Sequence, residues 1–385
     1  MLRESSAPRP DWREKCEAVG FTFHTVGEVP YWDESARYRF TLNQIDNDIE
    51  AATQELLALC YAAVSDLVGD EQALTRLGIP RDFWGAIAES WGLRDRDLYG
   101  RFDLAYNGHG PVKLLEFNAD TPTALLESAV VQWEWFENLR AAGGLSSGAD
   151  QYNSIHERLI AALGQMGIGG RLHLAALAGH EEDQATILYM ADCAAQAGLD
   201  PVPMAVEEIG VDARGRFTDL QDRIIRDLFK LYPWEWMARD AFGRHTLARP
   251  CRFIEPMWKM LLSNKGLCAE LWRLNPGHPN LLPSVYENDS AASALGTDIV
   301  RKPLFGREGA NIEIRHGARV VAASDGPYEG KAVLQALGPV FTDHGRTAIL
   351  GSWVVAGKAC GLCIREEDGP ITTNRARFIP HYIEG

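Results

Sequence analysis

The stretch DLYGRFDLAYNGHGPVKLLEFNADTPT, residues 97–123, carries the clearest structural signal in the chain. Apolar residues alternate with other residues in two runs, 97–106 and 111–118, and the four residues between the runs, NGHG, are typical of a turn. Two alternating runs around a short turn predict a β-hairpin.

Four polar side chains of the hairpin are expected on one face. Alternate residues of a strand share a face, so Arg101 and Asp103 project together, as do Glu116 and Asn118. If the turn is centred at 109–110, the two pairs oppose each other. Carboxylate and amide oxygens beside an arginine indicate a Mg²⁺ site that phosphate would complete. The alternative is an exposed polar face with surface ion pairs.

The hydrophobic period differs on the two sides of the hairpin. Residues 12–95 carry apolar residues at spacings of three and four, which predicts a helical N-terminal region; among them are Ile45, Ile49, Ala52, Leu56, Leu59, Cys60 and Val64. After the hairpin a helix is expected over 121–139. The small and polar residues 141–150 predict a flexible link.

The next segment predicts a βαβ unit. An apolar strand at 172–179 precedes a helix that ends at Gly198, and a second strand follows at 202–211. Ligands gather at the carboxyl ends of strands in such units. Glu181 and Glu182 lie at that end and suit a cationic amine, although the helix dipole also favours acidic residues in a first helical turn.

The last third of the chain begins with a predicted helix at 256–274, which Pro256 supports as a first-turn residue. Lys265 falls on the apolar stripe of this helix and therefore needs an anionic or carbonyl partner. A phosphate, a nucleotide base or an internal glutamate would serve. From Asp298 onward the pattern predicts strands and turns.

A glycine-rich turn follows the strand that carries Lys302. Its sequence is FGREGA, residues 305–310, and backbone amides of such turns can approach phosphate oxygens closely. A P-loop needs a helix after the glycines, whereas a strand is expected here. We therefore expect Gly306, Arg307 and Gly309 to belong to a lid over nucleotide phosphates, although glycine-rich turns are also common without a ligand.

A late strand carries Arg365 on the same face as Gly361 and Cys363. That face is open to a ligand, and the alternative for Arg365 is a surface pairing with Glu366 or Glu367.

Cysteine usage and composition limit the possible classes of protein. Seven scattered cysteines indicate reduced thiols, and the C-x-x-C pair Cys360 and Cys363 lies in a β-like run, where core packing is expected rather than redox chemistry. The 385 residues suggest two to three domains or one large one. No apolar run reaches the roughly 18 to 20 residues of a membrane span.

The charge and the N-terminus bear on partners and location. The net charge of −15 disfavours nucleic acid and anionic lipid as partners and leaves a cationic one open. The N-terminus lacks the apolar core of a signal peptide, so a cytoplasmic location is expected.

Six motifs, in order along the chain, carry a resemblance to a known family: RFD (101–103), LLEFNADTPT (114–123), EPMWKMLLSNK (255–265), RKPLFGREGAN (301–311), GSWVV (351–355) and CIREEDG (363–369). From about residue 12 to the end, the chain resembles the synthetase part of glutathionylspermidine synthase and its stand-alone bacterial relatives. The resemblance implies a mixed α/β (α+β) ATP-grasp fold with a pre-ATP-grasp α/β module. It also implies ATP-driven ligation of a carboxylate to an amine.

The resemblance also assigns site residues. The Mg²⁺ ligands would be Asp103, Glu116 and Asn118. Phosphate would be contacted by Arg101, and the transferred phosphoryl group steadied by Arg365. ATP would be bound by Lys265 and Lys302, together with Gly306, Arg307, Gly309 and Gln335. The acid substrate would lie near Thr121 and Thr123, and a polyamine near Glu181 and Glu182.

The expected organisation follows from these assignments. It comprises a helical region at 1–95, a pre-ATP-grasp module with the hairpin and substrate site at 96–250, and a nucleotide-binding module at 251–385, acting as one catalytic unit over 12–385. No amidase module is expected, and the threonines at 121 and 123 replace family serines, so glutathione and spermidine stay open as substrates. The alternatives are a peptide-like ligase and a nucleotide- or polyamine-binding protein without ligation. The sequence does not indicate an oligomeric state.

Overall fold

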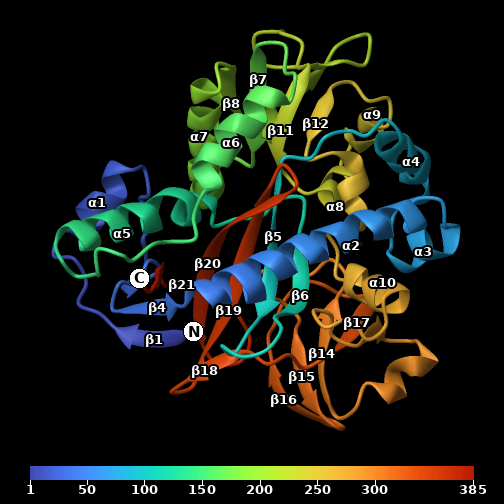
Figure 1. Cartoon of the computed structure of the whole chain (residues 1–385). Coiled ribbons are helices and arrows are strands. Elements are labelled where there is room, and N and C mark those ends of the chain that lie inside the picture. Colours follow the sequence, from blue (N-terminus) through green and yellow to red (C-terminus); the bar gives the residue numbers. More distant parts are fainter.

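The hairpin lies near the middle of the molecule (Figure 1), and a computed structural model describes all 385 residues. Strands β5 (Tyr99–Ala105) and β6 (Lys113–Asn118) pair antiparallel. Their register places the four polar residues in the predicted pairs, Arg101 with Asn118 and Asp103 with Glu116. The predicted hairpin and its register are confirmed.

The hairpin belongs to a six-stranded antiparallel sheet whose other strands come from the end of the chain. β5 pairs with β19 (Arg346–Val355), which pairs in turn with β20 (Lys358–Asp368) and with the short β18 (Phe341–Asp343). β21 (Arg377–Phe378) forms the far edge. Residues far apart in sequence therefore share one sheet, and Arg365 on β20 is brought close to the hairpin.

A five-stranded antiparallel sheet lies beside it. Its order is β13-β17-β14-β15-β16, with bounds Ser284–Tyr286, Ala332–Ala336, Asp298–Pro303, Glu313–His316 and Arg319–Ala323. β14 and β15 pair with each other and flank the glycine-rich turn. The predicted order of strand, glycine turn and strand is confirmed.

A parallel sheet forms the third large unit. Its order is β12-β11-β7-β8, with bounds Arg252–Ile254, Asp227–Leu231, Arg171–Ala176 and Asp200–Ala205. The helix α7 (Glu181–Gln196) connects β7 to β8 and lies against both strands, and α6 (Ile155–Gln165) packs beside α7 (Figure 1). The predicted βαβ unit is confirmed.

The N-terminal region is helical from Gln44 onward. A π-helical turn, η1 (Gln44–Glu50), continues into α2 (Ala51–Leu67), which crosses the face of the six-stranded sheet (Figure 1). All residues of the predicted apolar stripe except Leu59 are buried. α3 (Glu71–Arg76), the 3₁₀ turn η2 (Arg81–Phe83) and α4 (Trp84–Gly92) follow.

The helical prediction is wrong for much of the first 40 residues. β1 (Leu2–Ser5) and β4 (Ala36–Phe40) form a three-stranded sheet with β22 (His381–Ile383) at the opposite end of the chain. β1 pairs with β4, and β4 also pairs with β22, more than 300 residues further along the chain; short strands with such partners leave little local signal. The remaining early elements are α1 (Trp12–Ala18), β2 (Thr25–Val26) and β3 (Val29–Pro30).

Two predictions about connections are also corrected. The segment 141–150 is not a free link, because Leu145 and Ala149 are buried and Asp150 exchanges two backbone hydrogen bonds with Ile383. The predicted helix 256–274 is two helices, the 3₁₀ helix η5 (Met257–Leu261) and α10 (Gly266–Leu274).

The break between η5 and α10 has a local cause. The side chain of Asn264 accepts a hydrogen bond from the Gly266 N–H, and the Lys265 N–H donates to the Leu304 carbonyl instead of to a helical partner. Lys265 therefore stands just before the first turn of α10, directly beside β14.

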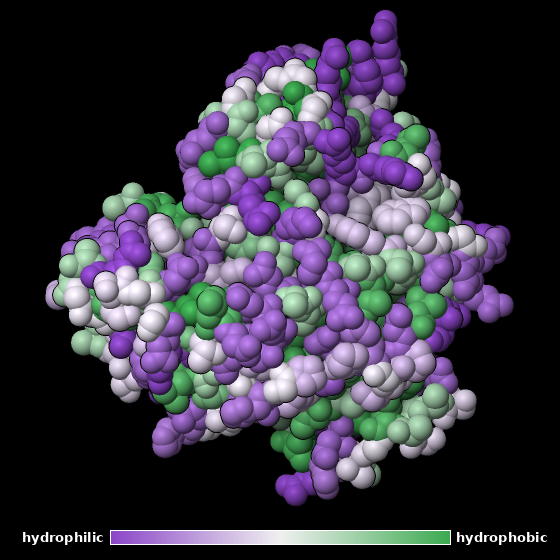
Figure 2. Space-filling view, in the orientation of Figure 1, coloured by the Kyte–Doolittle hydropathy of each residue, from purple (hydrophilic) through white to green (hydrophobic).

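Short elements complete the chain: η3 (Glu127–Val131), α5 (Gln132–Ala141), η4 (Val206–Glu208), β9 (Gly210–Val211), β10 (Phe217–Thr218), α8 (Trp234–Met237), α9 (Gly243–Thr246) and η6 (Ser290–Ala294). All seven cysteines are free, and Cys360 and Cys363 are fully buried, which confirms their packing function. None of the helices has the length and apolar character needed to span a bilayer. Hydrophilic residues are spread over all parts of the face seen in Figure 2.

Candidate active site

A cavity of about 730 Å³ lies where the hairpin, the five-stranded sheet and the strand β20 meet. Most of the residues singled out in the sequence line it: Arg101, Asp103, Glu116, Asn118, Thr121, Thr123, Lys265, Lys302, Gly306, Arg307, Gly309 and Arg365. Gln335, Glu181 and Glu182 do not line it. Five separate segments of the chain therefore converge on one site.

Asp103 on β5 is held by two arginines. Its Oδ1 lies 2.8 Å from Nε of Arg101, and its Oδ2 lies 2.5 Å from Nη2 of Arg365. Arg101 and Asp103 are only 4% and 3% exposed, so the alternative of an exposed polar hairpin face is wrong. The alternative pairing of Arg365 with its neighbour is also wrong, because Glu366 points to the other face and binds Arg3.

Glu116 on β6 is paired with Lys265. The Lys265 Nζ lies 2.8 Å from Oε2 of Glu116 and donates to the Gly306 carbonyl at 2.6 Å. Burial opposes the charge on Glu116, but Lys265 and then Lys302 outweigh it and hold the pKa of this carboxyl well below its usual range. The partner of Lys265 is thus the internal glutamate that the sequence left as one possibility.

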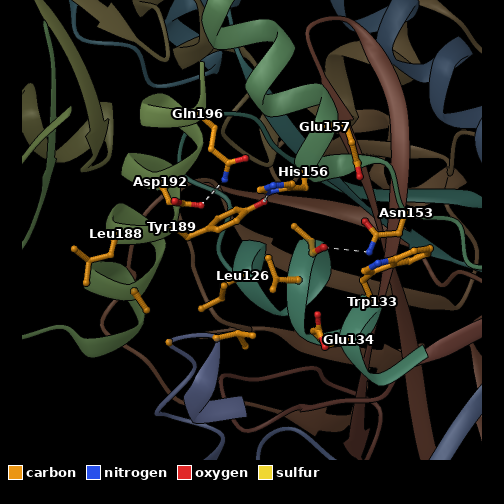
Figure 3. A pocket seen from close by; sticks show the side chains of 15 residues that line it. Leu126, Trp133, Glu134, Asn153, His156, Glu157, Leu188, Tyr189, Asp192 and Gln196 are labelled. Atoms are coloured by element: carbon orange, nitrogen blue, oxygen red, sulfur yellow. Dashed lines mark hydrogen bonds between the residues drawn. The ribbon is translucent and has the colours of Figure 1, made fainter. Parts of the chain in front are cut away.

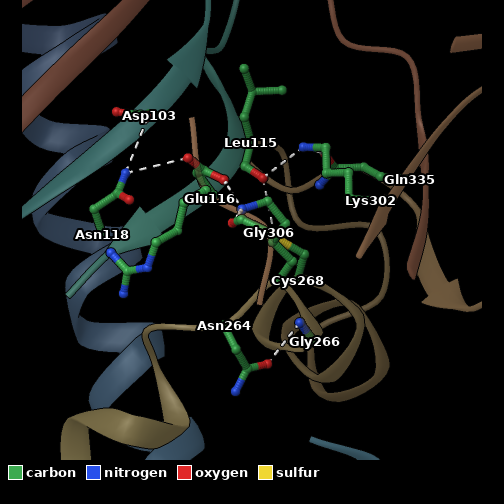
Figure 4. Close-up of polar contacts among 12 residues, drawn as sticks. Asp103, Leu115, Glu116, Asn118, Asn264, Gly266, Cys268, Lys302, Gly306 and Gln335 are labelled. Carbon is green, nitrogen blue, oxygen red and sulfur yellow. Dashed lines mark hydrogen bonds and ion pairs between the residues drawn. The ribbon is translucent and has the colours of Figure 1, made fainter. Parts of the chain in front are cut away.

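Lys302 on β14 reaches the neighbourhood of Glu116 and Lys265 from the five-stranded sheet. Its Nζ donates to the Leu115 carbonyl at 3.0 Å and to Oε1 of Gln335 at 2.7 Å (Figure 4). Burial lowers the pKa of Lys302. Gln335 is 1% exposed and its Nε2 donates to the Leu114 carbonyl, so it supports Lys302 from behind and does not face the cavity.

The charges at this end of the cavity do not balance. Two carboxylates, Asp103 and Glu116, face four cations: Arg101, Lys265, Lys302 and Arg365. Arg365 remains partly exposed, and its Nε has no hydrogen-bond partner in the protein. A surplus of positive charge in a recess favours a polyanionic ligand.

The predicted metal ligands fit Mg²⁺ by their chemistry. Asp103 and Glu116 supply carboxylate oxygens on one face of the hairpin, and Asn118 lies beside them. The Asn118 Nδ2 donates to Asp103 at 3.1 Å and to Glu116 at 3.4 Å, so this amide would have to turn its oxygen toward the ion to become a ligand. Mg²⁺ prefers such oxygens and usually keeps phosphate oxygens or water in its shell. No cluster of three or more His, Cys, Asp or Glu residues forms a metal site by itself. Phosphate oxygens would therefore have to complete this shell.

The glycine-rich turn is fixed over the cavity by Arg307. Its Nη2 lies 2.6 Å from Oε1 of Glu235, and its Nη1 donates to Oγ1 of Thr121 at 3.1 Å. Gly309 has a φ of +69°, and a Cβ atom there would lie 2.1 Å from the Thr372 carbonyl oxygen. Only glycine therefore fits where the turn meets the segment after β20.

The opposite end of the cavity is apolar. Its lining includes Val300, Ile312, Ile314, Val321, Leu337 and Ile371. The cavity thus joins a cationic end to an apolar end, as a nucleotide with its phosphates and base requires.

An acidic group that the sequence did not single out lies next to Thr123. Glu127 on η3 is 1% exposed and accepts a hydrogen bond from the Tyr31 hydroxyl at 2.7 Å. Burial and then the charge of Glu182 raise the pKa of Glu127 to about 8. Burial and then the charge of Asp183 raise the pKa of Glu182 as well. A hydrogen bond with Thr123 and the charge of Arg101 act in the lowering direction without cancelling this rise. The signal in the sequence is a glutamate inside the apolar run ALLESAVV.

The predicted acidic pair, Glu181 and Glu182, does not act as one group. Glu182 belongs to the group around Glu127, whereas Glu181 is exposed and accepts a hydrogen bond from Thr22 at 2.5 Å. Successive residues of a helix point about 100° apart, which explains why the pair does not act together.

A second cavity, of about 570 Å³, lies between α5, α6 and α7 (Figure 3). The Tyr189 hydroxyl and Nδ1 of His156 in its wall are 3.0 Å apart. Its charged lining residues are all acidic, namely Glu134, Glu157 and Asp192. It therefore lacks the cationic surplus of the first cavity, and no predicted site residue lines it.

Comparison with known proteins identifies the family and the fold. The family model of the glutathionylspermidine synthase preATP-grasp proteins matches residues 3–384. The chain belongs to this family. Its fold is the mixed α/β fold of the ATP-grasp type that the sequence predicts.

Two relatives and one solved structure are similar to this family member. It is 40% identical, over 100% of both chains, to a Haemophilus influenzae protein described as a "Putative acid--amine ligase". It is 29% identical to the trypanothione synthetase of Crithidia fasciculata, over 80% of this chain and 51% of that protein, so it spans about half of that relative. A glutathione synthetase-like effector of Globodera pallida has a similar fold, with a TM-score of 0.58, 10% identity and coverage of 97% and 95%.

Proposed function

We propose that the protein is an ATP-dependent ligase that joins a small carboxylic acid to an amine through an acyl phosphate. The observation that carries the proposal is the surplus of positive charge at one end of the cavity, where four cations face two carboxylates. The other end of the cavity is apolar. Relatives described as an acid–amine ligase and a trypanothione synthetase support the same chemistry.

ATP fits this cavity in one direction. The base would occupy the apolar end near Ile314 and Leu337, and the phosphates would extend toward Lys265 and Lys302. The phosphates would release Arg101 and Arg365 from Asp103, since a polyphosphate offers these cations a stronger partner than one carboxylate. Mg²⁺, held by Asp103, Glu116 and Asn118, would offset phosphate charge.

The first step creates the acyl phosphate. A carboxylate oxygen of the acid forms a bond to the γ-phosphorus while the bond from that phosphorus to the β,γ-bridging oxygen breaks, and ADP leaves. Lys302 and Arg365 stabilise the charge on the phosphoryl oxygens in this step. Thr121 and Thr123 lie where they can position the acid.

The second step forms the amide. The amine nitrogen bonds to the acyl carbon, the bond to the phosphate oxygen breaks, and inorganic phosphate leaves. Glu182 can accept the ammonium proton, because its raised pKa makes it a stronger base than a free glutamate. Glu127 and Tyr31 border the same place and would orient the amine.

The cavity draws on segments from both predicted modules, which supports one catalytic unit over residues 12–385. The hairpin supplies Asp103 and Glu116, while the last third of the chain supplies both lysines and Arg365.

Hydroxylamine trapping tests the function without knowledge of the amine. The protein is incubated with Mg-ATP, hydroxylamine and each member of a panel of amino acids, peptides and dicarboxylic acids, and ADP and hydroxamate are measured. We expect stoichiometric ADP and hydroxamate with at least one acid, and neither product in the Asp103→Asn variant. Tight Mg-ATP binding with no hydroxamate across the panel would contradict ligation and favour a nucleotide-binding protein.

A further inference from the structure

A second buried ion pair lies directly behind the cavity. Asp120 follows β6 in the chain, Lys230 belongs to β11 of the parallel sheet, and the Lys230 Nζ lies 2.5 Å from Oδ1 of Asp120. The two residues are only 1% and 2% exposed. Buried ion pairs add little to stability because of the desolvation penalty, so stability alone does not account for this pair.

The same carboxylate also holds the short helix α8. The Trp234 N–H, at the start of α8, donates to Oδ2 of Asp120 at 2.8 Å. Lys230 donates to the Tyr232 carbonyl at 3.1 Å, and its ammonium lies 4.7 Å from the ring centre of Trp234. A helix of four residues is not stable by itself, so its position depends on such contacts.

Both backbone segments joined by Asp120 carry a partner of Arg307. Thr121 directly follows Asp120 and accepts from Arg307, and Glu235 directly follows Trp234 and forms the ion pair with Arg307. The guanidinium also lies 5.5 Å from the ring centre of Trp236 in the same short helix. We call Arg307, Thr121 and Glu235 the Arg307 catch.

We propose that Asp120 and Lys230 are positioning residues for the Arg307 catch. Their ion pair sets the distance between Thr121 and Glu235 and so holds the glycine-rich turn over the cavity. The proposal rests on the proposed function only for its effect on turnover. The position of the turn itself is measurable without acid, amine or ATP, so the two proposals can fail separately.

Trypsin provides that measurement, because the bond after Arg307 is cleaved only when Arg307 leaves Glu235 and Thr121. The full chain is treated with dilute trypsin under native conditions, and the fragments 1–307 and 308–385 are quantified by mass spectrometry. Asp120→Asn keeps the size of the side chain and an acceptor for the Trp234 N–H. We expect about tenfold faster cleavage in this variant, the size associated with losing one charge-assisted hydrogen bond.

The control variant is Glu34→Gln. It breaks another buried pair, in which Glu34 lies 2.7 Å from Arg9 in the N-terminal segment. If the turn opens only because a protein with a broken buried pair is less stable, Glu34→Gln will accelerate cleavage after Arg307 as much as Asp120→Asn does. We expect no acceleration in the control, and equal acceleration would overturn the proposal.

Two double variants complete the test. Asp120→Asn with Lys230→Met removes the unpaired ammonium, which protects folding, and we expect it to keep the faster cleavage. Glu235→Gln alone should also accelerate cleavage, and adding Asp120→Asn should then change the rate less than twofold, since both substitutions act through one contact. If the two effects multiply in full, Asp120 does not act through the Arg307 catch, and the proposal is wrong.

Discussion

Two groups of buried charges in this protein differ in their balance. The site cluster, which lines the cavity, has two carboxylates and four cations: Asp103, Glu116, Arg101, Lys265, Lys302 and Arg365. The support pairs, Glu255 with Lys259 and Asp120 with Lys230, have no surplus of cations and are closed to solvent, although the Lys259 ammonium also lies 3.3 Å from the partly exposed Asp97. A balanced and closed pair belongs to the framework. An unbalanced cluster facing a cavity is prepared for a ligand of the opposite charge.

The largest effect on stability is expected when a support pair is broken. Glu255 accepts from the Leu98 and Tyr99 N–H groups at the start of β5, and its Oε2 lies 2.6 Å from Nζ of Lys259. Lys259→Met leaves a buried carboxylate without its cation, so we expect a loss of about 3 to 5 kcal/mol in the free energy of unfolding. Urea denaturation measures it. The double variant Glu255→Gln with Lys259→Met should lose clearly less, and an equal loss would contradict the interpretation.

A matched substitution in the site cluster should behave in the opposite way. Lys302→Met removes one of the surplus cations, so we expect the free energy of unfolding to change by no more than about 1 kcal/mol. Hydroxamate formation should fall about a hundredfold or more, which corresponds to roughly 3 kcal/mol of lost transition-state stabilisation. A stability loss as large as that of Lys259→Met would show that Lys302 serves the framework.

These contrasts indicate what the sequence could and could not predict. The hairpin register followed from local alternation and the centre of one turn, and it placed Asp103 opposite Glu116 correctly. The βαβ unit and the strands around the glycine turn also followed from local periods. Contacts between distant segments left no such signal, as with Glu235, which lies 72 residues from Arg307.

The residues whose roles were misjudged have two explanations, contacts with distant segments and local helical geometry. Gln335 lies on the predicted strand but behind Lys302, because the facing of β17 is set by its neighbours β13 and β14. Glu181 and Glu182 diverge because of helical geometry. Glu127 left a visible sign, a charge within an apolar run, whose meaning depended on Tyr31, 96 residues away.

A smaller effect, on nucleotide affinity, is expected for Gln335, which supports Lys302 without lining the cavity. Gln335→Leu removes one of the two acceptors of the Lys302 ammonium while leaving the cavity wall unchanged. We expect Mg-ATP affinity to fall about threefold to tenfold. This is the size expected when a charged group loses one hydrogen bond and water replaces part of it. Isothermal titration measures it. An unchanged affinity would show that Gln335 does not orient Lys302.

A pH-dependent effect is expected for Glu127. Its pKa of about 8 lies above the 4.5 of an unperturbed glutamate, so the folded state binds more protons between these values and stability falls as the pH rises through this window. Glu127→Gln stays neutral and loses that dependence. Relative to wild type, the Tm of the variant should rise by a few degrees between pH 5 and pH 8, as measured by scanning calorimetry. A constant difference would contradict the raised pKa.

The central claim is that the surplus cations of the site cluster bind the phosphates of a nucleotide. Isothermal titration of the wild-type protein with Mg-ATP, ADP and AMP tests it most directly, without any need to know the acid or the amine. We expect affinity to decrease in the order ATP, ADP, AMP, and Lys302→Met to weaken ATP binding at least tenfold while changing AMP binding little. Equal affinity for the three nucleotides, or an unchanged affinity of Lys302→Met for ATP, would contradict it.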